Sequence, residues 1–166
     1  MKQFCSFTLI LAMLVCAVGC HQESSEPEEI AFYYCVSQPD YSIGSTALAP
    51  EYRGGVPQDS LHQTLELYLS GPLSSDLQSP FPQDLKLVGV NQNGSTIQLT
   101  FSPELATLTG LDLTIACGCL TLTTLALTSA QQVEIRTVSG LLDGQRTITM
   151  DKNTLLLLDT AQDEGE

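Results

Sequence analysis

Apolar and polar positions follow two different periods along this chain, and each change of period marks a predicted element. Residues 30–36, IAFYYCV, are mostly β-branched and aromatic, which predicts a buried strand. The Ser-, Gly-, Pro- and Tyr-rich stretch 37–56 predicts a loop. A helix is expected next, begun by Asp59 or Ser60 and ended by Gly71-Pro72. Its apolar face follows the helical period, with residues Leu61, Leu65, Tyr68 and Leu69.

The middle of the chain predicts a hairpin. Residues 73–84 hold two prolines and predict an irregular connection. Two strands, 85–90 and 96–101, then flank Asn93-Gly94, the pair that most favours a two-residue hairpin turn. The apolar alternation of the first strand changes phase at Gly89, which indicates a β-bulge.

Residues 111–127 form the longest apolar run after the leader. Part of it, 120–123, alternates like a strand, but the length of the run favours a buried helix. Residues 132–138 alternate cleanly and predict a strand, followed by a turn at Asp143-Gly144. Residues 147–150 and 155–158 are expected to form a further hairpin or an ordered tail.

The predicted order is strand, helix, hairpin, helix, strand. It favours an α+β fold in which two helices pack on one face of a mostly antiparallel sheet. The predicted organisation is one domain over residues 30–158, preceded by a leader and tether and followed by an acidic tail at 159–166.

The first 19 residues predict an export signal. Lys2 is followed by an uncharged stretch, residues 4–18, which is shorter than the roughly 20 residues of a membrane-spanning helix. The ending Ala17-Val18-Gly19-Cys20 resembles the bacterial lipobox, although Ala17 stands where leucine is usual. This resemblance implies cleavage between Gly19 and Cys20 and lipidation of the Cys20 sulfur. The alternative is an ordinary secretory signal cut near Gly19, which would leave Cys20 a plain thiol.

Charge narrows the range of partners. Lys2 is the only basic residue of the leader, so the remainder carries five basic and 19 acidic residues, a net charge of −14. Such a surface repels nucleic acid and anionic lipid, so membrane attachment is expected to be covalent. Residues 20–29 contain no apolar side chain after Cys20 and predict a solvated tether with a reach of about 15–18 Å.

The order and spacing of several short motifs resemble the GerMN domain of spore-germination and sporulation lipoproteins. The resemblance rests on the strand 30–36, the helix end Leu69-Ser70-Gly71-Pro72, Ser79-Pro80-Phe81-Pro82, the hairpin ending QLTFS at 98–102, the apolar helix and the strand VEIR at 133–136. Together they cover residues 30–140, where a single GerMN-like domain fits. The best-known members of the family carry two such domains.

The resemblance implies a non-enzymatic, membrane-anchored domain on the extracytoplasmic face of the cell membrane. The fold of the family is similar to small ring-building domains of secretion machines, which implies a scaffold or assembly module that binds envelope proteins or its own copies. A link to sporulation or germination follows from the same resemblance. The alternative is a lipoprotein that binds a cell-wall glycan or peptide.

Few residues offer chemistry of their own. Cys117 and Cys119 lie two apart on the predicted helix and point about 200° apart, so they cannot chelate one ion from one face. Buried thiols are the simplest interpretation, and a disulfide from Cys35 to Cys117 or to Cys119 is the open alternative. No catalytic constellation, metal site or cofactor motif is recognised. Tyr33, Tyr41 and Tyr52 mark a candidate binding surface.

Overall fold

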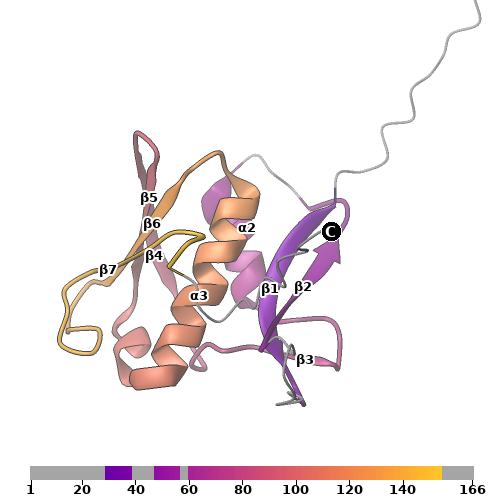
Figure 1. Ribbon diagram of the computed structural model, residues 1–166, viewed down its shortest axis with the longest axis horizontal. Helices are drawn as coiled ribbons and strands as arrows, with labels where there is room; N and C mark the ends of the chain where they lie inside the picture. The colour runs from indigo at the N-terminus through magenta and orange to yellow at the C-terminus, as the bar shows by residue number, and fades with distance from the viewer. Residues whose placement is uncertain (1–28, 39–46, 57–59, 155–166) are drawn as a thin grey trace, which may run out of the picture.

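The computed structural model describes residues 29–38, 47–56 and 60–154. The predicted leader, Cys20 with its expected lipid, Tyr41 and the acidic tail lie outside these ranges, so what was inferred about them stays a prediction. The described part is α+β, as predicted, but its strands form two sheets and not one. Figure 1 shows the longer helix lying between them.

The first sheet has three antiparallel strands in the order β2-β1-β3. They are β1 (Ile30–Val36), β2 (Leu48–Arg53) and β3 (Leu77–Gln78). Both β2 and β3 fall in stretches that the sequence predicted to be irregular. Proline is tolerated in β2 because this strand is an edge, so the N–H that Pro50 lacks is not needed for a second neighbour.

The second sheet has four strands in the order β4-β5-β6-β7. They are β4 (Leu87–Asn93), β5 (Thr96–Phe101), β6 (Gln132–Thr137) and β7 (Ile148–Met150). The β4–β5 hairpin is confirmed, but Asn93 pairs with Thr96, so its two-residue turn is Gly94-Ser95 and not the expected Asn93-Gly94. The register shifts between Leu87 and Gly89, where the bulge was expected. β5 and β6 are parallel because the chain between them crosses over through a helix.

Two α-helices and one 3₁₀ turn complete the described fold: α2 (Leu61–Leu69), η1 (Pro103–Thr107) and α3 (Gly110–Leu127). α3 packs against β1 of one sheet and against β6 and β7 of the other. By length and composition α3 resembles a membrane span, but more than half of it is buried inside the protein, as in the core helix of a globular domain. Because α3 lies between the two groups of strands, they do not join into the single sheet that the sequence predicted.

The core lies on the sides of both sheets that face α3. Strand residues at every second position point inward, including Phe32 and Tyr34 on β1, Ile97 and Leu99 on β5, and Val133 and Ile135 on β6. All of these are fully buried. The period-2 pattern of the sequence thus identified the inward faces of β5 and β6 correctly.

Candidate functional site

Two of the three tyrosines expected to form a binding surface lie on one face of the first sheet. Ala31 pairs with Tyr52 and Tyr33 pairs with Pro50, so Tyr33 and Tyr52 are diagonal neighbours across β1 and β2. Tyr52 is 62% exposed and Tyr33 is half-buried. Burial, and then the neighbouring Tyr52, raise the pKa of Tyr33. The Tyr52 ring is therefore open to a ligand, whereas Tyr33 packs in part against the cluster of Leu48, Cys119 and Leu122, and Tyr41 lies outside the described residues.

A cleft of about 700 Å³ opens where β6 ends, and it is the second candidate. We call it the arginine cleft, and it is lined by Thr100, Arg136, Thr137, Val138, Ser139, Gly140, Leu141, Arg146 and Thr147. The Arg136 side chain lies on the outer face of β6, and its Nε donates a 3.0 Å hydrogen bond to Thr100 Oγ1 on β5. Arg146 lies on the loop that returns toward β7.

The loop that carries Arg146 is held in place by its own turn. Leu142 is fully buried, and Leu142 and Gln145 exchange backbone hydrogen bonds of 2.8 and 2.9 Å. Asp143 (φ 49°) and Gly144 (φ 85°) close this turn in the left-handed region, as the sequence predicted for this pair. The turn therefore fixes Arg146 beside the end of β6 without help from a partner.

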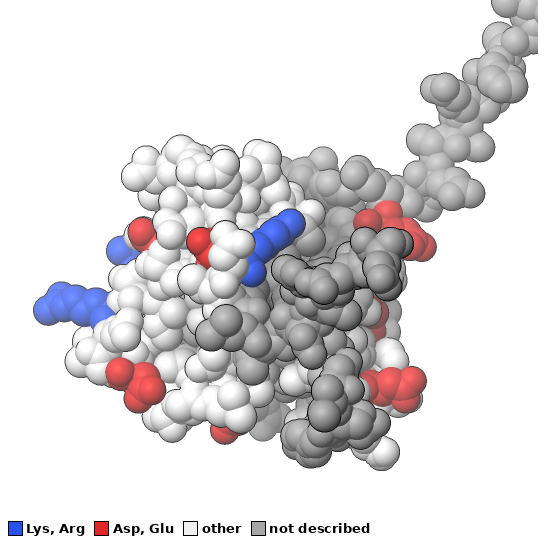
Figure 2. All heavy atoms as spheres, in the orientation of Figure 1, with Lys and Arg blue, Asp and Glu red and all other residues white. Residues whose placement is uncertain are grey.

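Neither arginine of the cleft is neutralised within the described part of the chain. The ion pairs found there are Arg53 with Glu51 and His62 with Glu66, and no carboxylate lies within 4.0 Å of Arg136 or Arg146. In Figure 2 the basic side chains on the visible face lie on its left side and near its middle, while acidic ones lie on both sides. Two unpaired cations at one cleft are notable in a chain this acidic.

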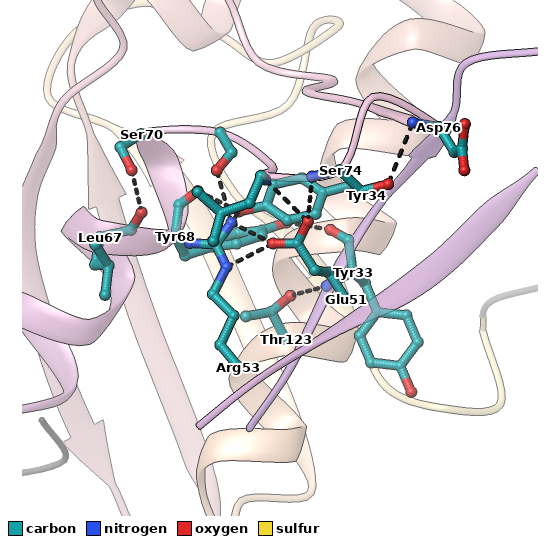
Figure 3. A network of polar contacts seen from close by, with 12 residues as sticks. Tyr33, Tyr34, Glu51, Arg53, Leu67, Tyr68, Ser70, Ser74, Asp76 and Thr123 are labelled. Atoms are coloured by element: carbon teal, nitrogen blue, oxygen red, sulfur yellow. Dashed lines mark hydrogen bonds and ion pairs between the residues drawn. The ribbon is translucent and has the colours of Figure 1, made fainter. Parts of the chain in front are cut away.

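A third group of polar residues surrounds Arg53, and its role is structural (Figure 3). Arg53 is buried and forms an ion pair with Glu51 on the same strand. It also donates to the Gly71 carbonyl at 2.8 Å and stacks over the Phe32 ring at 5.0 Å. Burial opposes ionisation of Glu51, but the hydrogen bonds from the Ser74 N–H, from Arg53 and from the Leu73 N–H outweigh it and lower its pKa. The pair ties β2 to the turn after α2.

The part of β1 that β3 does not reach is closed by side chains instead of a strand. The Tyr33 N–H donates to Thr123 Oγ1 of α3 at 2.9 Å, and the Tyr33 carbonyl accepts from the Tyr68 hydroxyl of α2 at 2.7 Å. These groups point away from β2, where Pro50 has no N–H to offer. Both helices are thereby locked to the edge of β1, which satisfies buried backbone groups and leaves no opening there.

Two neighbouring threonines of α3 give a matched test of this bond. Thr123→Val should lower the free energy of unfolding by about 1–3 kcal/mol, because the Tyr33 N–H then loses its acceptor. Thr121→Val should raise it by about 1 kcal/mol, because the buried Thr121 hydroxyl has no partner among the described residues. Threonine and valine have similar helix propensities, so urea unfolding compares the hydroxyls directly. Equal effects of the two variants would contradict the bond.

The three cysteines of the described chain are free thiols on two elements. Cys35 is half-buried on β1, whereas Cys117 and Cys119 are fully buried on α3. The two helical thiols diverge as predicted, since Cys117 packs in the main core and Cys119 in a smaller cluster that includes Cys35 and Leu48. In the described residues no three His, Cys, Asp or Glu side chains are grouped to hold a metal ion.

Sequence reasoning missed the arginine cleft and the burial of Arg53. The signals were faint but present: a basic residue on the outer face of the strand 132–138, and another just after the Asp143-Gly144 turn. Their meeting depends on the return of the loop to β6, which no local pattern encodes. For Arg53 the only local hint was Glu51 two residues earlier, which places both side chains on the same face of a strand.

Comparisons with known proteins agree on the type of domain. The family Germane, described as sporulation and spore germination, matches residues 32–146. A solved structure of the tandem GerMN domains of the sporulation protein GerM from Bacillus subtilis is similar in fold, with a TM-score of 0.54 at 13% identity. The match covers 76% of this chain and 45% of that one, so this chain spans less than half of the tandem structure.

A second solved structure, an inferred lipoprotein from Clostridium perfringens, has a TM-score of 0.49 at 15% identity and matches over 77% of this chain and 89% of its own. No protein in the curated set matches the sequence.

Proposed function

The chain belongs to the Germane family of sporulation and spore germination proteins, and from that premise we propose that it is a non-catalytic assembly module of the cell envelope. In this proposal a lipid on Cys20 anchors the chain at the extracytoplasmic face of the membrane, and the acidic tether holds the domain over residues 30–158 just above it. In this role the domain binds either other envelope proteins or its own copies, in sporulation or germination.

The arginine cleft is the observation that carries this proposal. Arg136 and Arg146 lack carboxylate partners in the described chain, and Val138 and Leu141 beside them are 54% and 52% exposed. Arginine next to exposed apolar side chains is the composition of a protein-contact surface. The cleft is also shaped before any partner arrives, because the Leu142 turn fixes one wall.

Charge favours an acidic partner surface, and the rest of this chain is one. A contact in which the cleft of one copy meets an acidic face of the next is head-to-tail, because the two surfaces differ. Head-to-tail contacts produce closed rings when the rotation between copies allows it, and open filaments when it does not. The proposal thus supplies a physical route to the assembly role that the family resemblance implies.

In-cell crosslinking of the full chain, followed by affinity capture and mass spectrometry, tests the proposal. The wild-type chain should capture its own copies or specific envelope proteins, and Arg136→Glu with Arg146→Glu should reduce that yield at least tenfold by reversing both charges of the cleft. Lys86→Glu with Lys152→Glu is the matched control, since it changes the net charge equally at exposed positions outside the cleft. Its yield should stay within twofold of wild type.

The anchor is tested in the same cells. Cys20→Ala should move the chain out of the membrane fraction and remove the captured membrane proteins. If the lysine double variant lost as much captured protein as the arginine double variant, net charge and not the cleft would govern the contacts. Capture of monomer together with wall fragments alone would contradict the assembly role.

That last outcome would favour the second candidate, binding of a cell-wall glycan or peptide at Tyr33 and Tyr52. Their adjacent rings on an open sheet face are the observation in its favour, because sugars stack on exposed aromatic rings. Tyr52→Ala would then abolish the recovery of wall fragments, and the cleft variants would leave it unchanged.

A further inference from the structure

The thiols of Cys35 and Cys119 are unused by the proposed assembly role, yet the fold brings them together from distant parts of the chain. The hydrogen bond from the Tyr33 N–H to Thr123 Oγ1 fixes where β1 crosses α3. The two elements run in opposite directions at this crossing (Figure 1). A step of two residues along β1 therefore corresponds to a step back along α3.

The lengths of these steps match. Going from Tyr33 to Cys35 advances about 6.6 Å along a strand and returns to the same face. Going from Thr123 back to Cys119 covers about 6 Å along a helix and also returns to nearly the same face. Cys119 thus lies opposite Cys35, and both side chains belong to one cluster with Leu48 and Leu122. The Cys119 thiol beside it is the main cause that lowers the pKa of Cys35.

Cys117 is excluded from this pairing by the helical period. It points about 200° away from Cys119 and packs in the main core among the strands of the second sheet. Burial raises the pKa of Cys117, and the hydrogen-bonding contribution of Cys35 together with burial raises that of Cys119, so acidity does not separate the two helical thiols. The direction in which each side chain points is what excludes Cys117 from the pair.

We propose that Cys35 and Cys119 form an intramolecular disulfide that joins β1 to α3. The inference rests on the extracytoplasmic location in the proposed function, because disulfides persist in oxidising compartments. The oxidant required is a disulfide-bearing molecule, either a small disulfide or a thiol oxidoreductase.

The different exposure of the two thiols sets the order of the exchange. Cys35 is the half-buried thiol, so its thiolate attacks the oxidant, forms a mixed disulfide and releases one oxidant thiolate. Cys119 then gives up its proton and attacks the Cys35 sulfur, which forms the Cys35–Cys119 bond and expels the second oxidant thiolate. Two protein thiols are oxidised and one oxidant disulfide is reduced to two thiols, with the protons passing to the thiolates.

The first test uses the purified full chain and glutathione disulfide, so its result does not depend on location. After oxidation, free thiols are alkylated under denaturing conditions and the peptides are mapped by mass spectrometry. The expected product links Cys35 to Cys119 and leaves Cys117 alkylated. Any link that includes Cys117, or free Cys35 and Cys119 after oxidation, would overturn the pairing.

A thermal melt of the same samples adds a readout of the bond itself. Reduction should lower the melting temperature of the wild-type chain by about 10 °C, because the disulfide constrains the unfolded chain over a long loop. Cys117→Ser should keep this shift, whereas Cys35→Ser and Cys119→Ser should each melt at the same temperature with and without reductant. A redox-dependent shift in Cys35→Ser would overturn the assignment.

The second test traps thiols in living cells and measures in the same sample whether external protease reaches the chain. An external, linked chain supports both proposals. A chain that is external but holds free Cys35 and Cys119 overturns the disulfide and leaves the assembly role standing. An internal chain overturns the location, and the purified-protein result then decides whether the two thiols are paired by the fold.

Discussion

Replacing Arg53 with methionine is expected to lower the free energy of unfolding by about 3–5 kcal/mol. Methionine keeps an apolar stem beside Phe32 but removes the positive charge that faces the partly buried Glu51 carboxylate. It also removes the donor to the Gly71 carbonyl, so the turn after α2 loses one of its bonds to β2 and keeps those from the Leu73 and Ser74 N–H groups to Glu51. Urea unfolding followed by circular dichroism measures the change.

Arg136→Met is the matched control, because the same change is made at an exposed arginine without a carboxylate partner in the described chain. Its effect should stay within about 0.5 kcal/mol. A double-mutant cycle with Glu51→Gln then separates the ion pair from the carbonyl bond. In the Glu51→Gln protein the ion pair is already absent, so Arg53→Met in that protein removes the bond to the Gly71 carbonyl and no ion pair. A loss below about 1 kcal/mol for Arg53→Met would show that the network is dispensable.

Tyr68→Ala is expected to cost a similar amount, about 3–5 kcal/mol, for a different reason. The side chain is fully buried, and its ring packs within 5.3 Å of the rings of Phe32, Tyr34 and Phe81. Truncation leaves a cavity where α2 meets the first sheet and removes the donor to the Tyr33 carbonyl. Thermal and urea unfolding should agree on the loss.

Two companion variants divide that cost into its parts. Tyr68→Phe retains the ring and should cost about 1–2 kcal/mol, which is the value of the bond to the Tyr33 carbonyl. Leu67→Ala changes the adjacent residue, which is 41% exposed, and should cost less than about 1 kcal/mol. If Tyr68→Phe were as damaging as Tyr68→Ala, the hydrogen bond and not the packing would hold α2.

The elements that could be predicted from the sequence are those whose pattern is local. The β4–β5 hairpin, the bulge at Gly89 and the inward faces of β5 and β6 follow from turn chemistry and a period of two, although the turn itself falls one residue later than expected, at Gly94-Ser95. The helix over 110–127 was identified by its length, although its threonines favoured a strand. A short apolar run is ambiguous, but a long one is not.

β2 shows why the rest escaped prediction. Its sequence, LAPEYR, contains a proline and two charged residues. It forms a strand because it pairs with β1, and because Arg53 and Glu51 form an ion pair and bond to the turn after α2. The split into two sheets has the same origin, since α3 occupies the space where a continuous sheet would run. Such choices depend on tertiary contacts that no window of sequence contains.

The candidate site was partly accessible to sequence reasoning. Tyr33 and Tyr52 were singled out for their residue type, and the strand register brings them together. Arg136 and Arg146 were passed over because an isolated basic residue on a strand or loop is usually solvated. Only the return of the chain through the Leu142 turn makes the two a pair.

The position of α3 between the sheets decides how the domain opens and closes. The two sheets share no strand, so no hydrogen-bonded ladder connects them. α3 contacts both and is buried on almost every side between residues 116 and 125. Its amide protons can therefore reach solvent only when both sheets separate from it, and their exchange reports global unfolding, whereas the tip of the β4–β5 hairpin can fray alone. α3, helped by α2, which contacts β4 and packs on β1, thus makes one cooperative unit of two sheets that share no strand.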